Sequence, residues 1–300
     1  MKKVRKTKSL VMPRRMYLFV LPALTLFLVF WIFPVLQLFY YSITNFNGIN
    51  YNTYKFVGMN NYIRLLKEGT LLNSIENTLK YTFIIVLLCN LLGLLLAMLL
   101  NLKIKGKTFF RTAAYIPALF SAIVIGYIWS YVYMPENGMI ASLVNLFGMD
   151  SSKLNILGNF KTALFGISIV DVWKNVGTTM IIYLAGLQTV DDSLLEAGRI
   201  DGCSEWGIIR RIKIPLISAT ITINVVLTVI SGLKAFDYSF IMTNGGPGKS
   251  TNTLMYTIYK IAFTDQMMGK ASAFSVVSFI VIILITIAML VVLNKKEVEL

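Results

Sequence analysis

The sequence predicts an all-α membrane protein, a polytopic bundle of six transmembrane helices with both termini in the cytoplasm. Of its 300 residues, 56% are hydrophobic and 14% are charged. Several apolar runs exceed the roughly 18 residues that cross a bilayer as a helix. One long polar segment, residues 187–215, separates two of these runs. This segment predicts a cytoplasmic helix-turn-helix between two membrane spans.

Six apolar segments are predicted to cross the membrane, and each is long enough to do so as a tilted helix. They comprise residues 17–41, 79–100, 113–133, 162–184, 216–241 and 272–293. The fifth is the least apolar, because it carries Asn224, Ser231, Lys234 and Asp237. Residues 60–75 have apolar side chains at helical spacing, which predicts a further helix on the outer membrane surface.

The distribution of Lys and Arg predicts the orientation. The chain has 28 Lys and Arg and 14 Asp and Glu, a formal net charge of +14. Basic residues are concentrated in residues 1–16, 101–112, 187–215 and 294–300, and such segments stay on the cytoplasmic side. We therefore expect two cytoplasmic tails, 1–16 and 294–300, around a transmembrane domain, 17–293. Because the positive charge lies beside apolar runs, we expect contact with membrane lipid and no binding of nucleic acid.

The residue types exclude several kinds of chemistry. The sequence contains no His, which rules out His-based metal sites, Ser-His-Asp triads and imidazole proton relays. We expect no metal site and no catalytic residue. Cys89 lies in an apolar run and Cys203 in the polar segment, so a disulfide between them is not expected.

Residues 243–250, TNGGPGKS, come close to a phosphate-binding P-loop. That motif requires Gly five positions before Gly248, where this chain has Thr243. No strand is predicted before it, and the segment is predicted to lie outside, where ATP is absent. A Gly/Pro turn at the outer end of the fifth span explains the pattern.

The polar segment 187–215 has the pattern of two short helices joined by a turn. Asp191 opens a run of three good N-cap residues that includes Asp192 and Ser193, Gly202 interrupts the helix, and Ser204 is placed to cap a second one. The second helix has an apolar stripe of Trp206, Ile208, Ile209 and Ile212. Pro215 then opens the fifth span, where its missing N–H costs little.

Two interpretations of this segment remain open on spacing alone. Amphipathic helices often lie at the membrane surface, and Arg210, Arg211 and Lys213 suit anionic lipid. A short helix inserted into the groove of a partner protein is an equally common arrangement. The carboxylates favour the groove, because they would be repelled by anionic headgroups; they are Glu196, Asp201 and Glu205.

The same segment resembles the cytoplasmic signature of ABC importer permeases. In that signature Glu-Ala-Ala is followed by three residues, Gly, nine residues and Ile-x-Leu-Pro; the matching residues here are Glu196, Ala197, Gly198, Gly202, Ile212, Ile214 and Pro215. The chain departs from the pattern at Gly198, where Ala is typical, and at Ile214, where Leu is. Segments that resemble the carbohydrate branch of this family are FVGMNNYIRLL (56–66), KGKTFFRTAAYIP (105–117), DVWKNVG (171–177) and AFDYSFIMT followed by NGGPGKST (244–251).

The resemblance implies a type I importer in a bacterial cytoplasmic membrane. Its permease pairs with a second, similar permease, a cytoplasmic ABC ATPase dimer that holds ATP and Mg, and an extracytoplasmic solute-binding protein. The chain itself would be no enzyme and would bind no cofactor. The residues expected to couple it to the ATPase are Glu196, Ala197, Gly198, Asp201, Gly202, Trp206, Ile212 and Pro215.

Polar residues inside the spans are the candidates for contacting a sugar, because they are costly in lipid and tend to face a cavity. The chosen set is Trp173, Asn175, Thr178, Asn224, Thr228 and Ser231. The last three share one helix face, at i, i+4 and i+7. Hydrogen bonding between helices is an equally open role for each. Two pairs are expected to form ion pairs, namely Asp171 with Lys174 and Lys234 with Asp237.

Three other functions remain as alternatives. An importer of glycerol phosphate or of a polyanionic sugar is indicated by Lys174 and Lys234. An ion-driven secondary transporter would use intramembrane acids, for which Asp171 and Asp237 are the candidates. A membrane enzyme such as a lipid transferase would need a cytoplasmic acid pair, and helix capping is the simpler role for Asp191 and Asp192.

Overall fold

The computed structural model describes residues 18–294 except 51, 103, 149 and 151–153, and for 292–294 it describes the backbone alone. The predicted N-terminal tail, Tyr17 at the start of the first span, and residues 295–300 of the C-terminal tail lie outside this range. The regular secondary structure of the described residues is helical, with no strand; their one β-bridge is isolated and joins Thr44 to Phe56.

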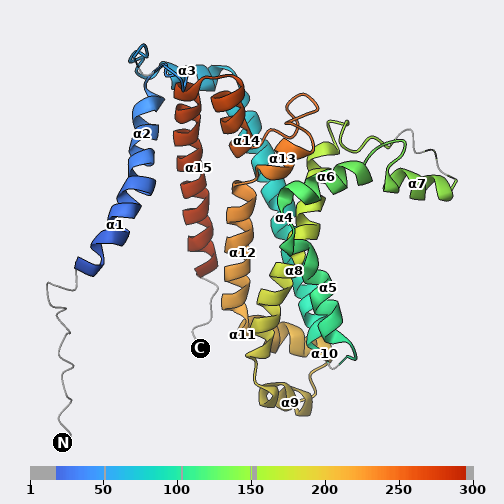
Figure 1. The fold of residues 1–300 in the computed structure, drawn as a ribbon. Helices are drawn as coiled ribbons and strands as arrows, with labels where there is room; N and C mark the ends of the chain where they lie inside the picture. The colour runs from blue at the N-terminus through green and yellow to red at the C-terminus, as the bar shows by residue number, and fades with distance from the viewer. Residues whose placement is uncertain (1–17, 51, 103, 149, 151–153, 295–300) are drawn as a thin grey trace, which may run out of the picture.

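The helices are drawn in Figure 1 and follow one another along the chain as α1 (Leu21–Phe27), η2 (Leu28–Ile32), α2 (Phe33–Ser42), α3 (Asn60–Lys67), α4 (Thr70–Asn101), α5 (Lys107–Leu119), α6 (Ala122–Val132), α7 (Met139–Leu146), α8 (Ala163–Gln188), α9 (Asp192–Ile200), α10 (Glu205–Ile208), η4 (Ile209–Lys213), α11 (Ile214–Leu216), α12 (Ser218–Leu233), α13 (Asp237–Ile241), α14 (Leu254–Tyr259), η5 (Lys260–Thr264) and α15 (Met268–Asn294).

Among the described residues, four helical runs are long and apolar enough to cross a membrane: Leu21–Ser42, Thr70–Asn101, Ser218–Ile241 and Met268–Val291. They coincide with the predicted first, second, fifth and sixth spans. The predicted fourth span is α8, which has 26 residues. Asp171, Lys174 and Asn175 make α8 more polar than these four runs. Helix α8 is therefore long enough to cross a membrane but is not apolar enough to be counted with them.

The prediction of a continuous third span over 113–133 is wrong. Helices α5 and α6 are bent by 99° at a short break, so the pair is either one broken span or a re-entrant loop. Pro117 lies inside the last turn of α5, Phe120 is extended, and the Ser121 hydroxyl caps α6 by accepting from the Val124 N–H. These helix stop and start signals could not be detected from hydropathy, because hydropathy measures how apolar a segment is and not where a helix ends or is capped.

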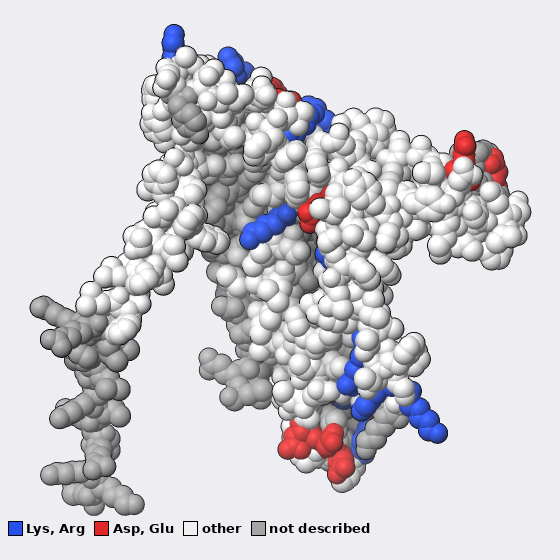
Figure 2. Space-filling view, in the orientation of Figure 1, with Lys and Arg blue, Asp and Glu red and all other residues white. Residues whose placement is uncertain are grey.

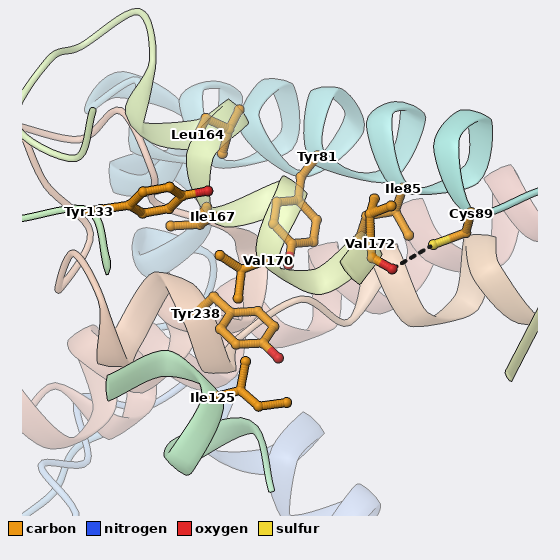
Figure 3. Packing of buried hydrophobic residues seen from close by; sticks show 10 residues of the cluster. All are labelled: Tyr81, Ile85, Cys89, Ile125, Tyr133, Leu164, Ile167, Val170, Val172 and Tyr238. Atoms are coloured by element: carbon orange, nitrogen blue, oxygen red, sulfur yellow. Dashed lines mark hydrogen bonds between the residues drawn. The ribbon is translucent and has the colours of Figure 1, made fainter. Parts of the chain in front are cut away.

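Helix α8 lies at the centre of the bundle and packs against α4, α5 and α12 (Figure 1). Figure 3 shows the largest buried apolar cluster, in which Tyr81, Ile85 and Cys89 of α4 face Val172 of α8. The close approach of α4 to α8 depends on a glycine. A Cβ on Gly93 would lie 2.8 Å from Thr179 Cγ2, and α4 meets α8 at this point.

The first run, α1 to α2, has a different environment from the rest of the bundle. No residue of α1 or η2 is buried, and in α2 only Ser42 is. Figure 1 shows the lower part of this run diverging from the other helices. An apolar helix exposed along its length requires lipid or another protein chain to cover it.

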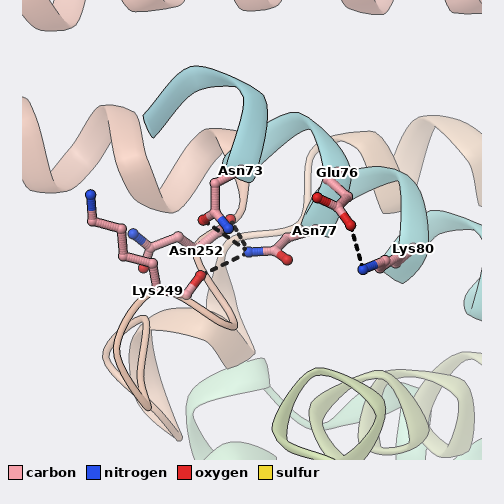
Figure 4. A network of polar contacts seen from close by, with 6 residues as sticks. All are labelled: Asn73, Glu76, Asn77, Lys80, Lys249 and Asn252. Carbon is pink, nitrogen blue, oxygen red and sulfur yellow. Dashed lines mark hydrogen bonds and ion pairs between the residues drawn. The ribbon is translucent and has the colours of Figure 1, made fainter. Parts of the chain in front are cut away.

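The segments at the opposite end from α9 form an ordered platform around the start of α4. Figure 4 shows the Asn77 amide donating to the carbonyl oxygens of Lys249 and Asn252, at 2.9 and 3.1 Å. The expected surface helix exists as α3, but it ends at Lys67, and Leu71 and Leu72 belong to the first turn of α4. The 243–250 segment is a turn region following α13, as the sequence predicted.

Replacement of Gly177 by Ala should destabilise the bundle, because a Cβ there would overlap the Ala114 carbonyl oxygen and lie 2.8 Å from Tyr115 Cα. Overpacking of this kind costs about 1–3 kcal/mol. Thermal unfolding of the detergent-purified chain should therefore show a lower Tm. Gly207→Ala is the matched control, because its Cβ would be 3.4 Å from the nearest atom. Equal Tm values for the two variants would contradict close α5–α8 packing.

Candidate functional site

The polar segment 187–215, hereafter the polar arm, contains two short helices joined by a turn. Asp191 caps α9 by accepting from the Ser193 N–H at 2.9 Å, and Ser204 caps α10 by accepting from the Gly207 N–H at 3.2 Å. Gly202 has φ +78° at the turn between them, a conformation that suits Gly. Pro215 lies in the short α11, and the fifth span begins at Ser218.

Several residues of the ATPase-coupling set hold the arm together from inside. Gly198 is buried, and a Cβ there would lie 2.6 Å from Ile212 Cδ1. Ile208 is fully buried in the same hairpin. The predicted apolar stripe is therefore divided: Ile208 and Ile212 face inward while Trp206 faces outward. The departure from Ala to Gly at position 198 brings α9 and η4 close together.

Other residues of the set point away from the hairpin. Glu196, Ala197 and Asp201 are exposed, and Trp206 is 68% exposed. Ile200, which was not among the predicted coupling residues, is 86% exposed. Exposed large apolar side chains at the tip of a short hairpin are typical of a surface that a partner covers.

Charge on the arm is divided between its two helices. Figure 2 shows acidic side chains gathered at the lower end of the molecule, over α9, with Lys and Arg beside them. Arg199 joins the two helices by donating to Glu205 at 3.0 Å. This contact lowers the pKa of the Glu205 carboxyl, and the Ser193 backbone N–H lowers the pKa of Asp191. Both acids thus remain ionised at neutral pH.

A hollow of about 690 Å³ lies on the arm. Its lining combines residues of the turn with residues of α10 and η4, namely Asp201, Gly202, Cys203, Ser204, Trp206, Gly207, Arg210 and Arg211. Three of the proposed coupling residues, Asp201, Gly202 and Trp206, thus border one concave surface.

A smaller pocket of about 160 Å³, hereafter the inner pocket, lies between α8 and α12. It collects five of the six predicted sugar-contacting residues: Asn175, Thr178, Asn224, Thr228 and Ser231. The remaining lining residues are Ile85, Thr179, Ile182 and Leu227. The apolar three were missed by sequence reasoning, because nothing distinguishes them from the many lipid-facing or core residues of the spans.

The polar residues in and around the inner pocket divide into two groups by their hydrogen bonds. Asn90 accepts from the Tyr183 hydroxyl at 2.6 Å and donates to Thr228 Oγ1 at 2.9 Å, which ties α4, α8 and α12 together. Asn224 donates to the Thr179 carbonyl oxygen at 3.3 Å. The hydroxyls of Thr178 and Ser231 are exposed and have no hydrogen-bond partner among the described residues. These two are free to bind a solute.

Trp173 does not join the inner pocket. It is 42% exposed and packs edge-on against Trp129, with ring centroids 5.5 Å apart. Its ring points away from the pocket-lining residues because positions 173 and 175 lie on different faces of α8.

The two predicted ion pairs are absent, although all four residues are described. Asp171 instead accepts hydrogen bonds from Tyr81 Oη at 3.0 Å and from Asn175 Nδ2 at 2.7 Å. The donors of α4 and of the next turn of α8 satisfy this carboxylate, so it does not require Lys174. Lys234 and Asp237 are both exposed and flank the break between α12 and α13.

Comparisons with known proteins agree with this architecture. Residues 89–297 match the family described as binding-protein-dependent transport system inner membrane component. The chain is 32% identical to the probable starch degradation products transport system permease protein AmyD of Thermoanaerobacterium thermosulfurigenes, over 94% of this chain and 95% of that one. It is 33% identical to the trehalose/maltose transport system permease protein MalF of Thermococcus litoralis, over 91% and 92% of the two chains.

A solved structure has the same fold. In the crystal structure of a bacterial alginate ABC transporter in complex with an alginate pentasaccharide-bound periplasmic protein, one chain matches with a TM-score of 0.80 at 21% identity, covering 92% of each chain. The chain therefore belongs to the family of ABC importer permeases, the membrane components of binding-protein-dependent transport. It is a multi-pass membrane transport subunit and not an enzyme.

Asn90, which bonds to the pocket residue Thr228, and the pocket residue Thr178 should respond differently to truncation. Asn90→Ala should destabilise the chain by about 1 kcal/mol, because it leaves the buried Tyr183 hydroxyl without a partner. Thr178→Ala loses no hydrogen bond and should change the stability by less than about 0.5 kcal/mol. Unfolding of both variants in mixed micelles measures the difference. A Thr178→Ala variant as unstable as Asn90→Ala would show that Thr178 holds the bundle together.

Proposed function

We propose that this chain forms half of the translocation pathway of an ATP-driven sugar importer in a bacterial cytoplasmic membrane. The observation that carries the proposal is the inner pocket, in which amides and hydroxyls from α8 and α12 converge without any charged side chain. Uncharged donors and acceptors match the hydroxyls of a sugar. The pathway is completed by a second permease of similar fold.

The names of the relatives support a carbohydrate solute. AmyD is named for starch degradation products and MalF for trehalose and maltose. A structurally similar bacterial ABC transporter is described as involved in the import of the acidic polysaccharide alginate, which keeps a polyanionic sugar as the second candidate. Lys174 and Lys234, which form no ion pair, favour that candidate, whereas the uncharged lining of the inner pocket favours a neutral sugar.

The proposed topology has six spans with both termini in the cytoplasm. It takes α5 and α6 together as the bent third span and α8 as the fourth. The protein-lined setting of α8 supports the latter assignment, because polar residues are tolerated in a span when they face other helices. The apolar, unburied α1 and η2 are suited to lie against lipid or the second permease.

The polar arm is proposed to insert into a cleft of the cytoplasmic ATPase, which holds ATP and Mg. The exposed residues Glu196, Ala197 and Trp206 would contact the ATPase. Gly198, Gly202 and Ile212 would preserve the shape of the arm, and Pro215 would link it to α12. A solute-binding protein would deliver the sugar to the opposite face.

The mechanism follows from the connections of the arm. Its two ends continue into α8 and, through α11, into α12, and these are the helices that line the inner pocket. Movement of the arm with a closing ATPase dimer would therefore be transmitted to both walls of the pocket. Rigid-body rotation of such helices is an established way to alternate access between two sides.

Glu196→Lys tests the coupling role. The reversed charge at a docked, desolvated contact costs several kcal/mol, so sugar uptake by proteoliposomes and the sugar-stimulated ATPase rate should both fall at least about a hundredfold. The chain should still insert, because Glu196 is exposed and makes no hydrogen bond or ion pair within the described residues.

Glu136→Lys is the matched control, since Glu136 is also exposed but lies after α6, far from the arm in sequence and at the other end of the molecule. It should transport like the unmodified chain. Full uptake and ATPase activity in the Glu196→Lys complex would disprove the coupling role of the arm.

A further inference from the structure

A second hollow lies where α6 packs against α13, apart from the inner pocket. It has a volume of about 420 Å³, and its lining includes Tyr127, Phe236, Asp237, Phe240 and Asn244. We call it the outer hollow, because it borders the platform at the end of the molecule opposite α9. None of its lining residues lines the inner pocket.

One wall of the outer hollow is a rigid aromatic surface. Phe236 and Phe240 stack with ring centroids 5.3 Å apart and an interplanar angle of 13°. Tyr259 packs edge-on against both rings, at 5.4 and 5.0 Å. Tyr127, which is 67% exposed, lines the hollow from α6. Stacked rings held from behind offer flat apolar faces to a ligand without losing conformational freedom on binding.

Two polar groups beside this wall are unused. The Asp237 carboxylate is exposed and has no hydrogen bond or ion pair in the described part of the chain. Asn244 accepts from the Tyr256 hydroxyl through its Oδ1 at 3.0 Å and through its carbonyl oxygen at 2.7 Å. These bonds fix the side chain and leave its NH₂ group as an exposed donor. The hollow thus offers one strong acceptor and one donor next to an aromatic surface.

This combination matches the two sides of a sugar ring, an apolar C–H face and an edge of hydroxyls. An anionic ligand fits less well, because Asp237 would repel it and none of the described lining residues is Lys or Arg. The exposed Lys234 precedes Asp237 by three residues, across the break between α12 and α13, but does not line the hollow.

We propose that the outer hollow is a second binding site for an uncharged sugar ring, distinct from the inner pocket. The inference rests on the proposed sugar import. The sugar occupies the outer hollow after release at the outer surface and before it reaches the inner pocket. Ser231 of the inner pocket and Phe236 of the outer hollow are separated by four residues, so the two sites follow each other along one chain segment.

Saturation-transfer NMR on the full complex in nanodiscs tests the site, with maltose and trehalose as probes. Selective irradiation of aromatic protons should transfer saturation to the sugar, and the inner pocket contributes little because no aromatic residue lines it. The double variant Phe236→Leu/Phe240→Leu should weaken the transfer about fivefold or more. Phe263→Leu is the control, because Phe263 is exposed and contacts Tyr259 outside the hollow.

Asp237→Asn tests the same site if the double variant fails to assemble, because this substitution keeps the side-chain volume. It should weaken neutral-sugar binding about threefold and reduce the preference for maltose over glycerol 3-phosphate. Asp265→Asn, at an exposed acid outside the hollow, should do neither. Saturation transfer and selectivity unchanged in all of these variants would overturn the site.

Uptake of maltose and trehalose by the same complex in proteoliposomes tests the proposed function separately. If the unmodified complex takes up the sugars and the outer-hollow variants bind them normally, sugar import is supported and the outer hollow is rejected as a binding site. An absence of uptake and of saturation transfer with both sugars in the unmodified complex would reject the second site together with import of these sugars.

Discussion

The position of α8 is the constraint on which the rest of the structure depends. In its middle it carries Asp171 and Asn175, and such groups cost several kcal/mol if they face hydrocarbon without partners. Tyr81 of α4 supplies the hydrogen bond that Asp171 needs from outside its own helix, at 3.0 Å. Helix α8 is therefore enclosed by α4, α5 and α12. Gly93 and Gly177 allow two of these neighbours to come close enough for that enclosure.

The enclosure also connects α8 and α12, which line the inner pocket, to α4. Asn90 connects α4, α8 and α12 through its bonds to Tyr183 and Thr228. Breaking these bonds during a transport cycle would leave buried polar groups unpaired, so the three helices are best moved together.

Hydropathy and capping patterns were sufficient to predict most of the helices and the two-helix form of the arm, because both depend on local sequence. The i, i+4, i+7 spacing of Asn224, Thr228 and Ser231 likewise predicted one shared face, which lines the inner pocket. The partner of Asp171 could not be predicted, because Tyr81 is 90 residues away and competes with the nearby Lys174. The bend after Pro117 was hidden within a continuous apolar run.

The arm combines residues that set its shape with residues that are exposed at its surface. Gly198 and Ile212 lie inside the hairpin, where the 2.6 Å approach of a Cβ to Ile212 Cδ1 leaves little room at position 198. Glu196 and Ala197, two positions and one position before Gly198, are exposed. Residues that form the hairpin thus alternate with residues that are free to contact a partner. A change inside the hairpin alters how the outward side chains are presented, so the two groups cannot vary independently.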